Sequence, residues 1–121
     1  MILTNEETKK FQKELNSGTT ALVLLSILGQ ASQPMYGYQI AKFIETNAAD
    51  THIMKQGALY PVLRSLESSG LLASEVEPSV SGPPRRYYSI TEAGRETLHR
   101  WRGIWAQTKA LVDKLLEGGG K

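Results

Sequence analysis

Cysteine is absent from the 121-residue sequence, which excludes disulfide bonds, cysteine-ligated metal sites and thiol nucleophiles. This absence also favours a reducing, cytoplasmic setting. The longest apolar run, ALVLLSIL, is far shorter than the roughly 20 residues that a membrane-spanning helix needs. The N-terminal segment mixes charged and apolar residues and lacks the apolar core of a signal peptide. We therefore expect a soluble cytoplasmic protein of one domain with no membrane partner.

An excess of charge of one sign is also missing. Fourteen Lys and Arg against twelve Asp and Glu give a net charge of +2, too little to indicate a polyanionic partner without local clustering. Catalytic motifs are lacking as well, because His52 and His99 lie far apart and no glycine-rich loop follows a strand. The sequence thus predicts no catalytic residue, no metal site and no cofactor. A hydrolase that uses either histidine is the least favoured function.

Apolar spacing predicts three helices in the first half of the chain. Phe11 and Leu15 among charged residues predict an amphipathic helix from Thr4 to about Asn16, which LNSGTT should end. The segment 19–30 is apolar nearly all round, so a second helix there should form the centre of the core. A third helix is expected over about residues 36–46, followed by the polar linker NAADTHIMKQ.

The stretch GALYPVLRSLESSGLL predicts a fourth helix that begins near Gln56 and ends at Gly70. Its core side comprises Leu59, Val62, Leu63 and Leu66. The opposite side carries no acidic residue and includes Pro61, which should leave the Gly57 carbonyl without its helical partner and give a slim first turn. Next, LLASEVEP and RRYYSI predict two strands joined by PSVSGPP, with Tyr88 facing the core.

Thr91 is a suitable N-cap for a last helix that should run to about Glu117. Apolar residues recur in this helix at alternating steps of three and four, which is the spacing of a coiled-coil seam. The helix should therefore pack on another helix, most simply on its copy in a homodimer, with help from the N-terminal helix. The expected dimer interface comprises Phe11, Leu15, Leu98, Trp101, Ile104, Trp105, Thr108, Leu111, Val112 and Leu115.

The order of these elements predicts a mainly α fold with a small β-hairpin, namely a winged helix-turn-helix with a long C-terminal dimerisation helix. We assign residues 1–90 to the winged domain with its N-terminal helix, 91–117 to the dimerisation helix and 118–121 to a disordered tail. Winged helix-turn-helix domains place one helix in the major groove of double-stranded DNA, so DNA is the expected partner.

A recognition helix needs hydrogen-bond donors and slim residues on an exposed face, with positive charge nearby for phosphates. The fourth helix and the wing sequence GPPRR meet these needs. Two alternatives stay open, since the wing arginines could merely offset Glu75 and Glu77, and Arg64 could be an ordinary solvated charge. The candidate DNA-binding residues are Tyr36, Tyr38, Lys42, Lys55, Gln56, Gly57, Ala58, Tyr60, Pro61, Arg64, Arg85 and Arg86.

Two tryptophans lie one helical turn apart on the expected dimer seam. A two-fold axis would gather up to four indoles from Trp101 and Trp105, and such a cluster can stack a flat aromatic ligand. The alternative is that both residues are ordinary interface anchors, an interpretation that we favour for Trp101.

The segments MYGYQIAKFIE, GALYPVLRSLESSGLL and GPPRRYYSITEAGRETL together resemble the PadR family of bacterial transcriptional regulators, over about residues 19–105. The resemblance implies a dimeric repressor that reads a near-palindromic operator and is released by a planar hydrophobic or aromatic effector. It also places Trp105 where compact multidrug-binding members have a tryptophan that lines a pore between subunits, with Trp101 at a neighbouring aromatic position. The competing interpretation is a winged-helix protein interaction module without specific DNA binding.

Overall fold

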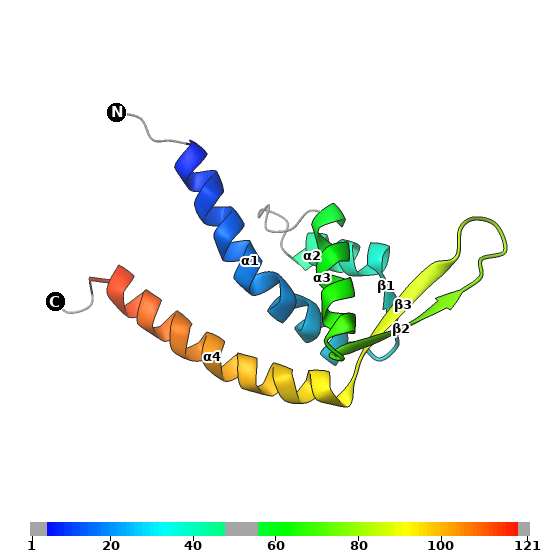
Figure 1. Ribbon diagram of the computed structural model, residues 1–121. Coiled ribbons are helices and arrows are strands. Elements are labelled where there is room, and N and C mark those ends of the chain that lie inside the picture. Colours follow the sequence, from blue (N-terminus) through cyan, green and yellow to red (C-terminus); the bar gives the residue numbers. More distant parts are fainter. Residues whose placement is uncertain (1–4, 48–55, 119–121) are drawn as a thin grey trace.

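The computed structural model describes residues 5–47 and 56–118, and the side chain of Gln56 lies outside the described part. The described chain forms a winged-helix body from which two long helices extend (Figure 1). Its elements are α1 (Asn5–Gln30), β1 (Met35–Tyr36), α2 (Gly37–Asn47), α3 (Gln56–Ser68), β2 (Leu72–Glu77), β3 (Arg85–Ile90) and α4 (Glu92–Leu116). The predicted fold class, mainly α with a small β-hairpin in a winged helix-turn-helix, is confirmed.

The N-terminal part of the chain is one continuous helix, so the predicted break at LNSGTT is wrong. The hydroxyl of Thr19 donates to the Leu15 carbonyl oxygen at 3.0 Å, and that of Thr20 donates to the Asn16 carbonyl oxygen at 2.7 Å. The polar side chains that suggested a turn therefore bond to the preceding turn of the helix. Gly18 costs only about 1 kcal/mol relative to alanine, which the long flanking segments of α1 offset.

The core lies where the second half of α1 meets α3 and the sheet. Leu24 and Leu25 of α1 are fully buried, as expected for the segment 19–30. Leu59 and Leu63 of α3 are buried against them, which confirms the predicted core side of that helix. The other buried apolar residues are Ile27, Leu28, Ile40, Leu66, Leu72, Tyr88 and Leu98.

A three-stranded antiparallel sheet has the order β1-β3-β2, and β2 with β3 forms the predicted wing. Tyr88 is 3% exposed and faces the core, as predicted, whereas Tyr87 lies half-buried on the other face. The sequence did not predict β1, because two residues are too few to produce an alternating pattern. Tyr36 consequently ends a strand instead of beginning α2, and it pairs with Tyr87.

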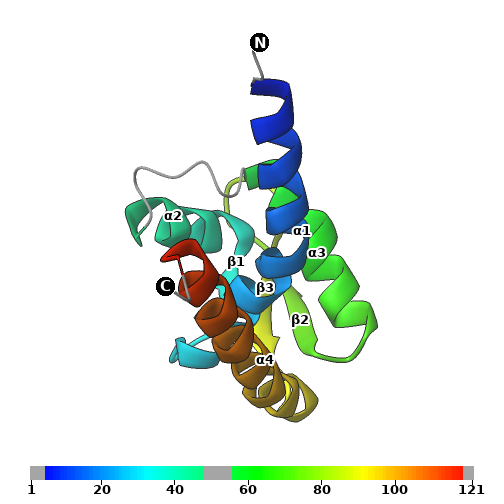
Figure 2. The ribbon, with the colours of Figure 1, turned by 90° about the vertical axis from the view of Figure 1, so that its left-hand side faces the viewer.

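Helices α1 and α4 lie close together next to the winged-helix body and diverge from each other away from it. The N-terminal end of α1 and the C-terminal end of α4 are therefore well separated in both views (Figures 1 and 2). Thr91 is the N-cap of α4, as predicted, and its side chain accepts a hydrogen bond from the Gly94 N–H. The helix ends at Leu116 with Glu117 as its C-cap, which agrees with the predicted end at about Glu117. None of the helices in the described part of the chain combines the length and the apolarity required to cross a lipid bilayer.

Candidate functional site

The first half of α3 presents a slim, exposed face. Gly57, Ala58, Pro61 and Arg64 are all exposed, and beyond the backbone of α3 itself no atom of the described residues lies within 4 Å of the position that a Cβ on Gly57 would occupy. Leu59, on the opposite side, is 1% exposed and anchors the helix in the core. This face is therefore open to a partner, as the sequence predicts. Lys55 and the side chain of Gln56, two further candidates, lie outside the described residues.

Tyr60 is placed differently from its neighbours on α3. It is half-buried and packs against the core, and a Cβ on Gly37 would overlap its ring. The ring therefore joins α3 to the first residue of α2. The absence of a side chain at Gly37 permits this contact, a role that the sequence did not reveal. Contact between Tyr60 and DNA stays a prediction.

Aromatic rings and cations gather where β1, α2 and β3 meet. The rings of Tyr36 and Tyr38 stack at 6.4 Å between centroids, and the ring of Tyr87 meets that of Tyr36 edge-on at 5.3 Å. The guanidinium carbon of Arg85 lies 4.5 Å from the Tyr36 ring centroid, which is close enough for a cation–π contact. Three predicted DNA-binding residues, Tyr36, Tyr38 and Arg85, thus share one surface.

Lys42 extends this surface along α2. Its Nζ lies 6.0 Å from the Tyr38 ring centroid and 3.6 Å from the Glu45 carboxylate. Both partners of this ion pair are well exposed, so water and salt weaken it. Lys42 can therefore exchange Glu45 for an incoming anion at little cost.

The two wing arginines do not act as a pair. Neighbouring residues of a strand point to opposite faces of the sheet. Arg86 Nη1 donates to Ser74 Oγ at 2.9 Å, and Ser74 Oγ donates to Glu67 Oε2 at 2.7 Å. Arg86 is thus tied across β2 to α3, whereas Arg85 contacts Tyr36 on the other side. The sequence predicted the same role for both arginines. Their different partners could not be predicted, because they depend on the register of the hairpin.

The alternative in which the wing arginines offset Glu75 and Glu77 stays open, because the hairpin register places Glu77 opposite Arg85 although the two side chains form no ion pair. Within residues 5–47 and 56–118, the ion pairs are Lys42–Glu45 and Lys109–Asp113. Arg86 is instead close enough to influence Tyr88. Burial raises the pKa of Tyr88 above its ordinary value of 10.0, the charge of Arg86 opposes this effect, and Glu67 adds to it. The Tyr88 hydroxyl therefore stays neutral at physiological pH.

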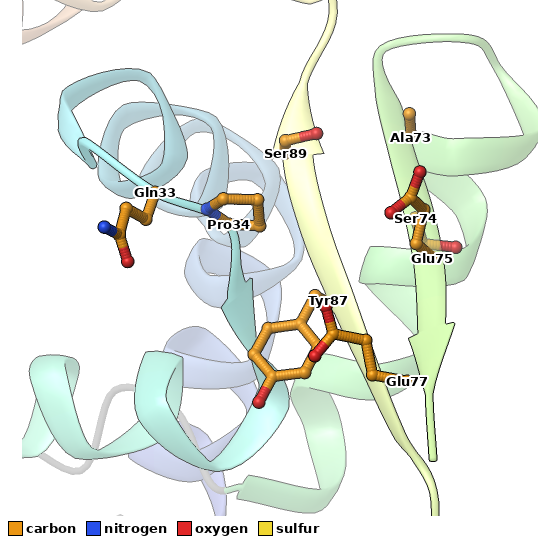
Figure 3. A pocket seen from close by; sticks show the side chains of 8 residues that line it. All are labelled: Gln33, Pro34, Ala73, Ser74, Glu75, Glu77, Tyr87 and Ser89. Carbon is orange, nitrogen blue, oxygen red and sulfur yellow. The ribbon is translucent and has the colours of Figure 1, made fainter.

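The outer face of the sheet holds an open hollow of about 460 Å³ (Figure 3). Its lining comprises Gln33, Pro34, Ala73, Ser74, Glu75, Glu77, Tyr87 and Ser89. Two carboxylates and no cationic side chain belong to this lining, so the hollow would repel phosphate. The hollow itself is therefore an unfavourable place for a phosphate group.

A second opening of about 430 Å³, here called the interhelical groove, separates α1 from α4. Its lining comprises Glu14, Leu15, Gly18, Thr19, Ala21, Leu22, Trp101, Ile104, Trp105 and Thr108. Trp101 packs partly against the core of its own chain, whereas Trp105 is 42% exposed. The structure thus brings both candidate effector-binding residues to one apolar groove.

The remaining members of the expected dimer interface fall into two groups. Phe11, Leu111, Val112 and Leu115 are 63%, 58%, 45% and 64% exposed along the two extended helices. Leu98 differs from them because it is 8% exposed and belongs to the core of its own chain. Its seam position in the sequence therefore reflects packing within the chain, next to Gly29.

Comparisons with known proteins agree with the geometry of this winged body. The model of the transcriptional regulator PadR-like family matches residues 24–100. The structure of a PadR family transcriptional regulator from Eggerthella lenta is 34% identical, with a TM-score of 0.76 over 93% of this chain and 95% of that one. This chain belongs to the PadR-like family of transcriptional regulators.

Two further relatives support the same assignment. The structure of a transcriptional regulator from Clostridium thermocellum is 27% identical, with a TM-score of 0.74 over 84% of this chain and 96% of that one. A protein of Lysinibacillus sphaericus is 30% identical over 83 residues, which are 69% of this chain and 76% of that protein. The likeness therefore extends over most of both chains.

Proposed function

We propose that this protein binds double-stranded DNA through α3 and the wing and represses transcription as a homodimer. The observation that carries the proposal is the exposed, slim half of α3 with Arg64, together with the two exposed arginines of the wing. An α-helix with small residues at its N-terminal end fits the major groove, and nearby arginines contact phosphates. Membership of a family of transcriptional regulators supports this function over a protein interaction module. Such a regulator would act in the cytoplasm.

The test of DNA binding starts from a pool of random duplexes, from which the protein selects its preferred sequence. Fluorescence anisotropy then compares the selected duplex with a scrambled duplex at fixed salt, because affinities without a salt concentration cannot be interpreted. We expect the selected sequence to be near-palindromic and to bind at least 1000-fold more tightly, roughly the lower limit for specific binders. Equal affinity for both duplexes would refute the proposal.

The homodimer is supported by the apolar residues along α1 and α4 that nothing covers within the described chain. Side chains such as Phe11 and Leu111 are more than half exposed, which is unfavourable for a helix that remains alone in water. Two copies related by a two-fold axis would bury these faces against each other. Sedimentation equilibrium should give the mass of a dimer, and Leu111→Glu should shift it to that of a monomer.

The effector is proposed to bind in the interhelical groove. Both tryptophans contribute to its lining, and a flat apolar molecule would stack on the exposed part of the Trp105 ring. Binding there would alter how α1 and α4 pack in the dimer and so release the operator. A titration with a planar probe such as acridine should quench tryptophan fluorescence and lower operator affinity. Quenching without any loss of affinity would contradict the release step.

A further inference from the structure

Arg85 and Arg86 are neighbours in the wing, yet different partners hold them. Arg85 lies over the ring of Tyr36 and is opposite Glu77 in the hairpin, but it forms no ion pair with a carboxylate of the described residues. Arg86 donates to Ser74 Oγ at 2.9 Å, and the same hydroxyl donates to the Glu67 carboxylate at 2.7 Å. We call the chain of contacts from Arg86 through Ser74 to Glu67 the wing strut. It joins β3, β2 and α3.

The wing strut has a cation at one end, Arg86, and an anion at the other, Glu67. The hydroxyl of Ser74 accepts from a cation and donates to an anion, and hydrogen bonds with a charged partner are stronger than neutral ones. Ser74 also lies directly opposite Tyr88 in the hairpin, and Tyr88 is buried in the core. The strut is therefore anchored at its middle by the sheet and at its end by α3.

Arg86 is linked to the Glu67 carboxylate through the Ser74 hydroxyl, whereas Arg85 forms no ion pair with a carboxylate of the described residues. A guanidinium that is already linked to a carboxylate through a hydroxyl group gains less electrostatic energy from a new phosphate contact than a guanidinium without such a link. The position of the wing relative to α3, in contrast, decides whether both elements reach the DNA at the same time. Fixing that position before binding removes an ordering cost from association.

We propose that Arg86 is a positioning residue, which sets the angle between the wing and α3 through Ser74 and Glu67, while Arg85 contacts the DNA phosphates. This inference rests on the proposed DNA binding and assigns a separate role to each arginine. It also makes Glu67, an acidic residue on the recognition helix, favourable for DNA binding. Simple electrostatics predicts the reverse, because a carboxylate near DNA repels phosphates.

The first experiment measures operator affinity for Glu67→Ala and for its matched control Glu75→Ala. Glu75 lines the hollow on the outer face and takes no part in the wing strut. Loss of the strut should weaken binding about two- to tenfold in Glu67→Ala, which corresponds to one hydrogen bond, and Glu75→Ala should bind at least as tightly as the wild type. Alanine suits a helix interior, so folding is preserved. Tighter binding by Glu67→Ala would overturn the proposal.

The second experiment compares the salt dependence of affinity in Arg85→Gln and Arg86→Gln, which remove the same charge from adjacent positions. Arg85→Gln should lower the slope of log K against log salt by about 0.9 for each subunit. Arg86→Gln should weaken binding with little change of slope, and adding Ser74→Ala should cause no further loss. A slope change in Arg86→Gln equal to that in Arg85→Gln would overturn its positioning role.

The third experiment needs no DNA and uses the lack of cysteine in the chain. Spin labels at Val80→Cys in the wing and Ser68→Cys at the end of α3 report the distance between these elements, with labelled chains diluted in unlabelled ones. The distance distribution should broaden in Ser74→Ala and Glu67→Ala but not in Glu75→Ala. Unchanged distributions in all three would refute the strut. Broadening in a protein that binds no DNA would support the strut and refute the proposed function.

Discussion

The hydroxyl of Thr91 donates a 2.7 Å hydrogen bond to the carbonyl oxygen of Gly70. Gly70 ends α3 with a φ of 83°, a left-handed conformation that suits glycine, and Thr91 begins α4. The backbone N–H of Thr91 also donates to the Leu71 carbonyl oxygen at 3.1 Å. The end of the proposed recognition helix and the start of the proposed dimerisation helix therefore meet at one junction.

Thr91→Val should weaken this junction, because valine keeps the shape of threonine but removes both side-chain hydrogen bonds. We expect the free energy of unfolding to fall by about 1 kcal/mol, the usual cost of losing an N-cap. Chemical denaturation at a fixed protein concentration measures the change. Thr91→Ser retains the hydroxyl and should remain near the wild type, so an equal loss in both variants would contradict the assignment.

Gly94 is packed against the same junction. A Cβ at this position would overlap the backbone of Leu71 and the side chain of Ile90, so Gly94→Ala should destabilise the fold by about 1–3 kcal/mol. Gly103, on the same helix, has no atom within 4 Å of its Cβ position. Gly103→Ala should stabilise the protein by up to about 1 kcal/mol. Thermal unfolding of the two variants should therefore shift in opposite directions.

Pro61 lies inside α3 and is exposed. Proline in a helix interior costs about 3 kcal/mol relative to alanine, so Pro61→Ala should raise the free energy of unfolding by up to that amount. If Pro61 shapes the turn that enters the groove, the same variant should change operator affinity. Anisotropy titrations would show this, and unchanged affinity would remove Pro61 from the DNA-binding residues.

Trp105→Ala should abolish effector binding while leaving DNA binding intact. Trp101 then remains as the only tryptophan, and its fluorescence should no longer be quenched by acridine. Trp101→Phe is the matched control, because it keeps an aromatic ring and leaves Trp105 to report the ligand. Quenching that survives in Trp105→Ala would place the ligand outside the interhelical groove.

The sequence predicted those parts of the fold that local patterns decide. The leucine face of α3, the cap at Thr91, the turn at Gly70 and the inward side of Tyr88 all follow from spacing and residue type. The continuity of α1 was missed, because threonine side chains that bond back to their own helix look like turn residues in the sequence.

The candidate site was less predictable, since its key contacts join residues that are far apart in the chain. In the sequence, Ser74 and Glu67 are polar residues without a distinguishing pattern. The hairpin register places Ser74 beside Arg86, and the packing of β2 on α3 places Glu67 beside Ser74. Likewise, the contact between Gly37 and Tyr60 depends on how α2 crosses α3. Only the assembled fold reveals these relationships.

The central claim is that the exposed face of α3 reads DNA, and operator binding by Arg64→Ala tests it most directly. Arg102, an exposed arginine on α4, provides the matched control with the same loss of charge. By fluorescence anisotropy at fixed salt, Arg64→Ala should lose about 1–3 kcal/mol of specific binding and keep its affinity for scrambled DNA within severalfold. Arg102→Ala should bind the operator as the wild type does. Wild-type operator affinity in Arg64→Ala would contradict the claim.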